Sequence, residues 1–195
     1  MLVSKAATQN QSHGGIEQSC YVGKGIQTTM IPKIYYENNN KWYAEARYNY
    51  EEQQTFSLIA GKVFSKKSNL SYSVTPMAGF AVGNFNGALL GMKIEMEHNN
   101  LFFSSESQYG FSVRTRREDF FYSWSDAGYQ VRSWIYAGLA MQLTITNEAS
   151  EHMEPGIFIG FPFKKWTFPV YIFNPAGKNM YAVLGITYEW GSHKQ

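Results

Sequence analysis

Residues 42–50 read Trp-Tyr-Ala-Glu-Ala-Arg-Tyr-Asn-Tyr, and two kinds of side chain alternate along them. On an extended chain, one face carries Trp42, Ala44, Ala46, Tyr48 and Tyr50, and the opposite face carries Tyr43, Glu45, Arg47 and Asn49. Successive side chains of a β-strand point to opposite faces, so this period of two predicts a strand with one apolar and one polar face. Such a strand separates an apolar environment from a polar one.

The same alternation continues along most of the chain, in residues 70–82, 88–97, 131–145 and 180–190. Turn-forming clusters separate the alternating stretches, at residues 38–40, 51–54, 66–69, 84–87, 99–100, 114–119, 147–154, 164–165 and 174–179. The strands are about 9–13 residues long, which is enough to cross a bilayer when tilted. We predict an all-β fold, a closed antiparallel up-and-down transmembrane β-barrel of about 12 strands, with 10 strands as the alternative. The count of 12 includes the weak segment 17–25.

Composition supports a barrel in a membrane. Charged residues make up 16% of the chain, against roughly 25% in soluble domains. Aromatic residues make up 17%, and no run of about 18 apolar residues predicts a transmembrane helix. A soluble barrel with an apolar interior is the main alternative. It is disfavoured because the apolar face is bulky along nearly the whole of each strand, while the other face mixes Ser, Thr and Gly with Lys and Glu.

Two further classes are excluded by charge and by cysteine content. The net charge of +2 is too small to indicate nucleic-acid binding. Cys20 is the single cysteine, so no disulfide framework and no cysteine metal site is expected.

The last strand carries a resemblance to a known group. Residues 181–190, Tyr-Ala-Val-Leu-Gly-Ile-Thr-Tyr-Glu-Trp, resemble the closing strand of bacterial outer-membrane β-barrel proteins, which typically ends on an aromatic residue. Residues 120–124, 135–142 and 169–175 resemble strands of uncharacterised barrels of that class in Gram-negative bacteria. The resemblance extends over residues 25–190. It implies an integral outer-membrane location and leaves the activity open. Residues 191–195 depart from the pattern, because they follow the aromatic residue.

The chain is organised as one domain. We expect a flexible N-terminal arm at 1–16, a single barrel at 17–190 and a C-terminal tail at 191–195. No signal peptide follows Met1, so we infer that the native leader is missing from this sequence. Membrane lipid is the expected partner. Other outer-membrane proteins are a further partner class, and nucleic acid is not expected.

Alternation places a set of charged side chains in the lumen: Lys33, Glu45, Arg47, Lys93, Glu95, Glu97, Glu106, Arg132 and Glu189. They indicate either the lining of a small pore or a network that neutralises itself and fills a narrow barrel. Their mixed signs argue against strong ion selectivity. We predict a narrow small-solute channel with a polar, charge-paired lumen. The alternative is a structural or accessory barrel subunit of an outer-membrane complex, and a membrane-embedded enzyme comes third.

Catalysis has one candidate location, Ser150 with His152, in the segment 147–154. Neighbours in a loop rarely have the geometry of a triad, and no third group is present to orient them. We therefore expect no enzyme activity and no catalytic residue, metal site or cofactor.

Turn length predicts which residues of neighbouring strands lie opposite each other. A two-residue turn at 99–100, which we expect to be of type I′, pairs Met96 with Phe103 and places Lys93 opposite Glu106. A turn formed by the three asparagines 38–40 places Lys33 opposite Glu45.

Three prolines and one lysine lie at unusual positions inside predicted strands. Pro32, Pro76 and Pro169 lack the amide donor of a ladder, so we expect bulges or bends there. Lys62 falls on the apolar face near a strand end, where its amine can reach the headgroups.

The resemblance also orients the barrel. It implies that the C-terminus is periplasmic, together with the turns at 38–40, 66–69, 99–100 and 164–165. The turns at 51–54, 114–119 and 147–154 then face the outside.

Overall fold

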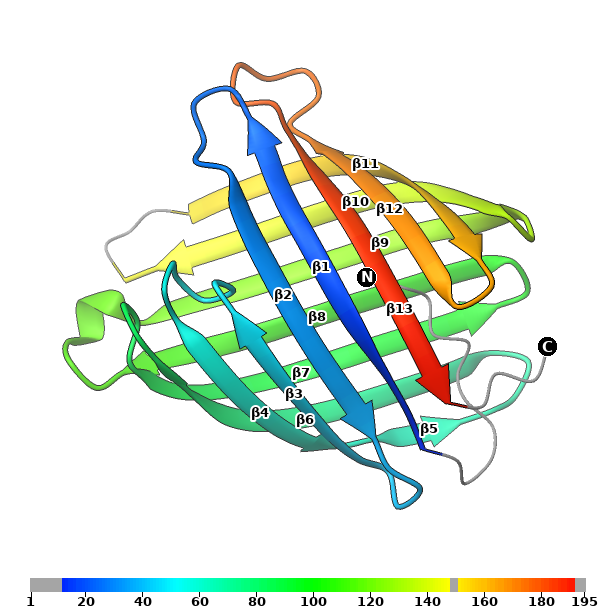
Figure 1. Cartoon of the computed structure of the whole chain (residues 1–195), viewed down its shortest axis with the longest axis horizontal. Helices are drawn as coiled ribbons and strands as arrows, with labels where there is room; N and C mark the ends of the chain where they lie inside the picture. Colours follow the sequence, from blue (N-terminus) through cyan, green and yellow to red (C-terminus); the bar gives the residue numbers. More distant parts are fainter. Residues whose placement is uncertain (1–11, 148–150, 192–195) are drawn as a thin grey trace.

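The structure, a computed structural model, describes residues 12–147 and 151–191. Ser150 and most of the predicted arm and tail lie outside these ranges. The described residues form antiparallel strands and one short 3-10 helix (Figure 1). The strands are β1 (His13–Gly23), β2 (Thr29–Glu37), β3 (Trp42–Tyr48), β4 (Phe56–Lys62), β5 (Phe64–Lys66), β6 (Ser71–Val82), β7 (Gly87–His98), β8 (Leu101–Ser112), β9 (Phe120–Arg132), β10 (Ile135–Thr146), β11 (Glu151–Phe163), β12 (Trp166–Phe173) and β13 (Tyr181–Gly191); the helix is η1 (Arg116–Glu118).

The strands close into a barrel. Neighbours along the sequence pair in turn, and β1 pairs with β13 to join the two ends of the described chain. The ring is completed between β4 and β6, where Phe56 lies opposite Val82. This makes a closed ring of twelve strands, with the short β5 paired to β6 outside it. The predicted closed antiparallel barrel of twelve strands is confirmed. None of the described residues forms a helix long and apolar enough to cross a membrane.

The first strand starts earlier than predicted. β1 begins at His13, so the segment predicted as an arm up to residue 16 includes the start of a strand. Ile16 lies opposite Tyr188 of β13 on one side and Ile34 of β2 on the other. This segment therefore forms a strand that is paired along both edges, although its sequence alternates only weakly.

Two of the three prolines interrupt a ladder, and none of them shifts its register. The β4–β6 ladder ends at Gly61 opposite Met77, and the β5–β6 ladder resumes at Phe64 opposite Val74 in the same register. Pro76 stands in this gap, where it has no amide hydrogen to donate. Proline thus explains the break that separates β5 from β4.

Pro169 produces a similar gap between β12 and β13, where pairing passes from Thr167 directly to Val170. The proline ring lies over Gly185, at which an added Cβ would be 2.6 Å from Pro169 Cγ. Pro32 keeps its regular place opposite Gln18. No bulge occurs at these prolines, so that part of the expectation is wrong, and local bends stay a prediction. Within residues 12–147 and 151–191, the register shift that is observed lies between Ile135 and Tyr136.

The predicted register of the β7–β8 hairpin is confirmed. Lys93 lies opposite Glu106, and Met96 lies opposite Phe103. The predicted turn type is wrong, because Asn99 has a positive φ of 53° and Asn100 does not. A type I′ turn requires positive φ at both positions. The length of the turn was therefore enough to predict this register, although its type was not predicted correctly.

The predicted register of the β2–β3 hairpin is wrong by two residues, since Lys33 lies opposite Arg47 and not opposite Glu45. The side chain of Asn38 caps the turn, with its Oδ1 accepting from the amides of Asn40 at 2.9 Å and Trp42 at 3.0 Å. The loop is consequently 39–41, with the positive φ of 64° at Lys41. Because the shift is even, both strands keep their predicted faces.

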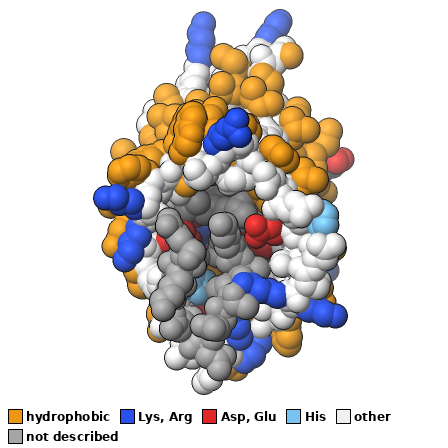
Figure 2. Space-filling model, turned by 90° about the vertical axis from the view of Figure 1, so that its right-hand side faces the viewer, with side chains coloured by type: hydrophobic (Ala, Val, Ile, Leu, Met, Phe, Trp, Pro, Cys, Tyr) orange, Lys and Arg blue, Asp and Glu red, His pale blue; other side chains and the backbone are white. Residues whose placement is uncertain are grey.

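The two faces of the wall differ as the alternation predicts. Large apolar side chains such as Leu139, Met30 and Trp42 are exposed on the outside. The residues that alternate with them along each strand are buried or half-buried inside. Figure 2, turned toward one end of the barrel, shows hydrophobic side chains around its outer wall. At one strand end, Lys62 Nζ lies 4.9 Å from the centre of the Trp42 ring. Its amine also donates to Asn40 O in the turn between β2 and β3, and its contact with headgroups stays a prediction.

Short and long connections lie at opposite ends of the barrel, because the strands are antiparallel. The end that holds both termini of the described chain has the turns 38–41, 67–70, 99–100, 133–134 and 164–165. The other end has the connections 24–28, 49–55, 83–86, 113–119 and 174–180, most of which are longer. We call them the turn end and the loop end.

Candidate functional site

A buried arginine forms the centre of a charged cluster in the lumen. Arg47 on β3 is 1% exposed. Its Nε donates to Glu45 Oε1 at 2.6 Å, and its Nη1 donates to Gln108 Oε1 at 3.0 Å. The guanidinium also forms ion pairs with Glu106 of β8 and, at 3.7 Å, with Glu51. Several carboxylates therefore compensate one buried cation, as a dry interior requires.

Two lysines near this cluster are paired as well. Lys33 Nζ lies 3.0 Å from Glu17 Oε2, and Lys93 Nζ lies 3.0 Å from Glu95 Oε1. The inner face of each strand points its polar residues toward the same space, so residues distant in the sequence meet there. On the neighbouring β13, Glu189 accepts a hydrogen bond of 2.7 Å from the Tyr35 hydroxyl.

The structure brings most of the sequence-predicted lumen residues together. Lys33, Glu45, Arg47, Lys93, Glu95, Glu106 and Glu189 are buried or half-buried on inward faces. Glu97 is half-buried near the end of β7, opposite Phe102. Arg132 is different, since it is exposed as the last residue of β9, next to a turn.

Two members of the cluster were not predicted. Glu17 lies in the weak first strand, directly opposite Lys33, and alternation with Ser19 and Tyr21 would have placed it inside. Glu51 follows β3 in a connection, where no strand periodicity applies, and only the structure shows that it turns inward.

Aromatic side chains fill the opposite side of the lumen. Its buried residues are Phe102, Tyr136, Ala140, Phe158, Tyr171, Phe173, Tyr181 and Val183, with Tyr21 and Trp124 packed against them. Asp126 is 1% exposed among them and accepts from Trp124 Nε1 at 2.8 Å and the Tyr171 hydroxyl at 3.0 Å. Sequence reasoning missed this cluster, because aromatic residues suit a lipid-facing wall as well as a packed interior.

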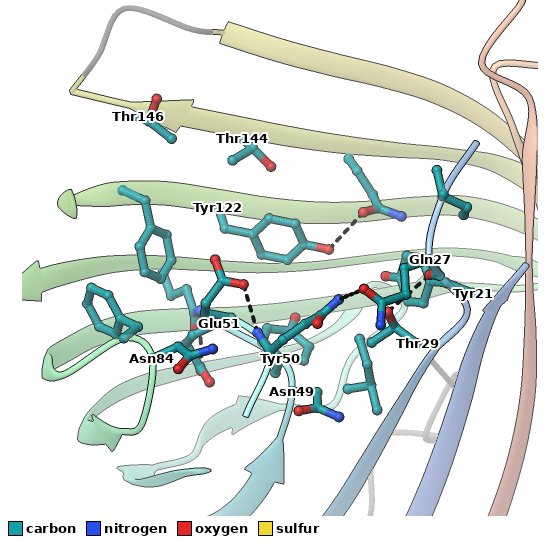
Figure 3. A pocket seen from close by; sticks show the side chains of 18 of the residues that line it. Tyr21, Gln27, Thr29, Asn49, Tyr50, Glu51, Asn84, Tyr122, Thr144 and Thr146 are labelled. Carbon is teal, nitrogen blue, oxygen red and sulfur yellow. Dashed lines mark hydrogen bonds between the residues drawn. The ribbon is translucent and has the colours of Figure 1, made fainter. Parts of the chain in front are cut away.

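A cavity of about 780 Å³ lies at the loop end of the lumen. Figure 3 shows how Tyr21, Tyr50, Glu51 and Tyr122 lie around it. Its lining is Tyr21, Ile26, Gln27, Thr29, Ile31, Asn49, Tyr50, Glu51, Glu52, Gln53, Asn84, Phe85, Gln108, Arg117, Glu118, Phe120, Tyr122, Gln142, Thr144, Thr146, Glu154 and Tyr181. The cavity has the size of an ordinary small-molecule site.

Tyr50 reaches the cavity because the chain leaves the strand before it. Asn49 has a φ of 60°, its amide donates to Thr55 O at 2.9 Å, and its side chain accepts from the amide of Gln54 at 2.8 Å. The Tyr50 ring lies 4.1 Å from Arg47 Cζ. The alternation places Tyr50 on the outer face, and that prediction is wrong, because β3 ends at Tyr48.

A smaller cavity of about 30 Å³ adjoins the large one, with Tyr21, Ile31 and Tyr50 lining both. Its other lining residues are Glu17, Ser19, Lys33, Glu106, Trp124 and Tyr171. The cavity between Tyr21 and Tyr50, which we call the shared tyrosines, and the charged cluster is therefore much smaller than the cavity at the loop end. A volume of this size accommodates a few water molecules at most.

The described residues offer little for catalysis. His152 is exposed on β11, and its proposed partner Ser150 lies outside the described residues. In residues 12–147 and 151–191, no group of three or more His, Cys, Asp or Glu side chains is arranged to hold a metal ion.

Solved structures show which known fold this barrel has. The KdgM porin superposes with a TM-score of 0.65 at 13% identity, covering 92% of this chain and 99% of its own. The KdgM porin in complex with disordered oligogalacturonate gives 0.66 at 12% identity, with coverages of 92% and 99%. The NanC porin gives 0.56 at 10% identity, with coverages of 93% and 100%. This chain has the fold of bacterial outer-membrane porins. No protein-family model and no curated protein matches its sequence.

Proposed function

We propose that this protein is a narrow channel for small solutes in a bacterial outer membrane. The observation that carries the proposal is the cavity of about 780 Å³ at the loop end, inside a closed barrel whose outer wall is apolar. A soluble barrel rarely exposes so many large apolar side chains to water, whereas a wall that faces lipid is covered with them. The shared fold of the KdgM and NanC porins agrees with this function.

The charged cluster is the narrow part of the proposed channel. Arg47, Lys33 and Lys93 are each paired with a carboxylate, which supports a polar, charge-paired lumen. Paired charges of both signs give little net preference for cations or anions at this point. A solute passing from the large cavity meets the shared tyrosines before it reaches these charges.

Conductance in planar bilayers tests the channel directly. The purified protein, refolded in detergent, should produce discrete current steps in KCl. Their conductance should be small, because the cavity that adjoins the large one, next to the charged cluster, holds only about 30 Å³ of free space. Correctly folded protein that produces no current steps would favour the alternative, a structural or accessory barrel in an outer-membrane complex.

Cysteine labelling in intact cells tests location and orientation together. In a Cys20→Ser background, Lys178→Cys at the loop end and Lys165→Cys at the turn end are both exposed lysine positions in connections. We expect a membrane-impermeant maleimide to label position 178 in intact cells, and position 165 only after the outer membrane is broken. The reverse pattern would invert the orientation, and equal labelling would contradict insertion.

A further inference from the structure

Four tyrosines line the large cavity in two contacting pairs. Tyr50 and Tyr122 meet edge to face with their ring centres 5.7 Å apart, and Tyr21 and Tyr181 stack at 6.0 Å. A tyrosine offers a flat apolar face and a hydroxyl at its tip. The pairs therefore form rigid surfaces for a flat solute that has apolar C–H faces and hydroxyl groups at its edges.

Gln142 adds a buried hydrogen-bond donor beside these rings. Its side chain is 5% exposed, and its Oε1 accepts from the Tyr122 hydroxyl at 3.1 Å. Its Nε2 forms no hydrogen bond of ordinary length and angle among the described residues, and the Tyr21 hydroxyl lies near enough to interact with it weakly. Gln142 itself lines the cavity. A buried N–H without an acceptor is costly. A solute oxygen at this position would satisfy it.

Carboxylates dominate the charge of the same lining. Glu51, Glu52, Glu118 and Glu154 line the cavity, and Arg117 is the cationic side chain that lines it. Glu51 is paired with Arg47 at 3.7 Å. Within the described part of the chain, Glu52, Glu118 and Glu154 form no ion pair. The lining accepts hydrogen bonds from hydroxyl and ammonium groups and repels anions.

We propose that the large cavity binds uncharged and amine-bearing saccharides of one or two rings and disfavours acidic ones. This inference rests on the proposed channel function and names its substrate class. Tyrosine faces, one buried amide donor and several carboxylate acceptors match the C–H faces, oxygens and hydroxyls of a sugar. Oligogalacturonate, the polycarboxylate bound by the KdgM porin, has the wrong charge for this lining.

Solute entry into proteoliposomes tests the charge preference. Glucose, glucosamine hydrochloride and sodium glucuronate are similar in size and differ in charge. We expect glucose and glucosamine to enter, and glucuronate to enter about ten-fold more slowly. Replacing together the three carboxylates that form no ion pair (Glu52→Gln, Glu118→Gln and Glu154→Gln) should remove most of that difference. Glu151→Gln changes an exposed carboxylate on the outward face of β11 and is the matched control, with no expected effect.

Gln142→Leu tests the donor, because leucine has a similar volume and no N–H group. Glucose entry should slow about five-fold, the value of one hydrogen bond, and KCl conductance should fall by a smaller factor. The electrophoretic mobility of unheated samples verifies that each variant forms a barrel.

Two outcomes would overturn the inference while KCl current persists. One is that glucuronate enters as fast as glucose, and the other is that glucose entry is unchanged in a folded Gln142→Leu variant. Loss of all current in the unmodified protein would instead refute the channel, and the inference with it.

Discussion

The two sides of the lumen are filled in different ways. On one side, which we call the charged wall, ion pairs join side chains of β1, β2, β3, β7 and β8. Its residues are Glu17, Lys33, Glu45, Arg47, Lys93, Glu95 and Glu106. On the other, the aromatic wall, Tyr136, Phe158, Tyr171, Phe173 and Tyr181 pack from β10, β11, β12 and β13. The stability of the charged wall depends on each charge keeping its particular partner. The stability of the aromatic wall depends on side chains that fill its volume. The two should therefore respond differently to conservative and to disruptive substitutions.

The largest expected effect is at the centre of the charged wall. Arg47→Met removes one buried cation and leaves Glu45 and Glu106 without it. Breaking a buried pair costs about 3–5 kcal/mol, so we expect a loss of that size in the free energy of unfolding. Urea titration of the protein refolded in lipid vesicles measures it. Arg132→Met, at an exposed arginine, should stay within about 0.5 kcal/mol. A loss below about 1 kcal/mol for Arg47→Met would mean that the pairs are not needed for stability.

A charge on the outer surface should be destabilising behind the aromatic wall. Leu139 on β10 is 66% exposed, and its neighbour Ala140 is buried inside. Leu139→Arg should destabilise by about 2–4 kcal/mol if this surface meets lipid near the middle of the bilayer. Val113→Arg, at an exposed residue in a connection, is the control. Equal unfolding midpoints for the two variants in lipid vesicles would contradict a lipid-facing wall.

A conservative change should be tolerated better in the aromatic wall. Phe173 is fully buried there, and Phe173→Leu keeps the apolar character at a cost of about 1 kcal/mol. Arg47→Lys is equally conservative by charge but loses the planar fork that contacts Glu45, Glu106 and Gln108. Urea titration in vesicles should show a larger loss for Arg47→Lys. The reverse order would remove the distinction between the two walls.

These differences also explain how far sequence reasoning could reach. Alternation predicted that the Arg47 side chain points into the lumen. One two-residue turn predicted that Lys93 lies opposite Glu106 on the neighbouring strand. The position of Lys33 did not follow, because the Asn38 side chain moved the loop by one residue. Tyr50 was misplaced because alternation holds only within a strand.

The cavity was harder still to predict. It depends on connections such as 49–55, which fold inward through individual turns and hydrogen bonds. The aromatic wall was invisible in the pattern, because rings such as Phe158 occupy lipid-facing and packed positions equally well.

The smallest expected effect is the coupling between Lys93 and Glu106. Their strand positions are directly opposed, and opposite charges at such positions contribute about 0.2–1 kcal/mol. Each has a closer partner in the structure, however, since Lys93 Nζ binds Glu95 at 3.0 Å and Glu106 binds Arg47. We therefore expect the lower part of that range in a double-mutant cycle of Lys93→Met and Glu106→Gln, measured by urea titration in vesicles. The cycle of Lys93→Met with Glu95→Gln is the matched comparison and should give the larger coupling. If the cross-strand coupling were the larger, Lys93 would turn toward Glu106 in the membrane, and register would determine the pairing inside the charged wall. A smaller cross-strand coupling would show that Glu106 interacts mainly with Arg47, which leaves Lys93 to bind Glu95.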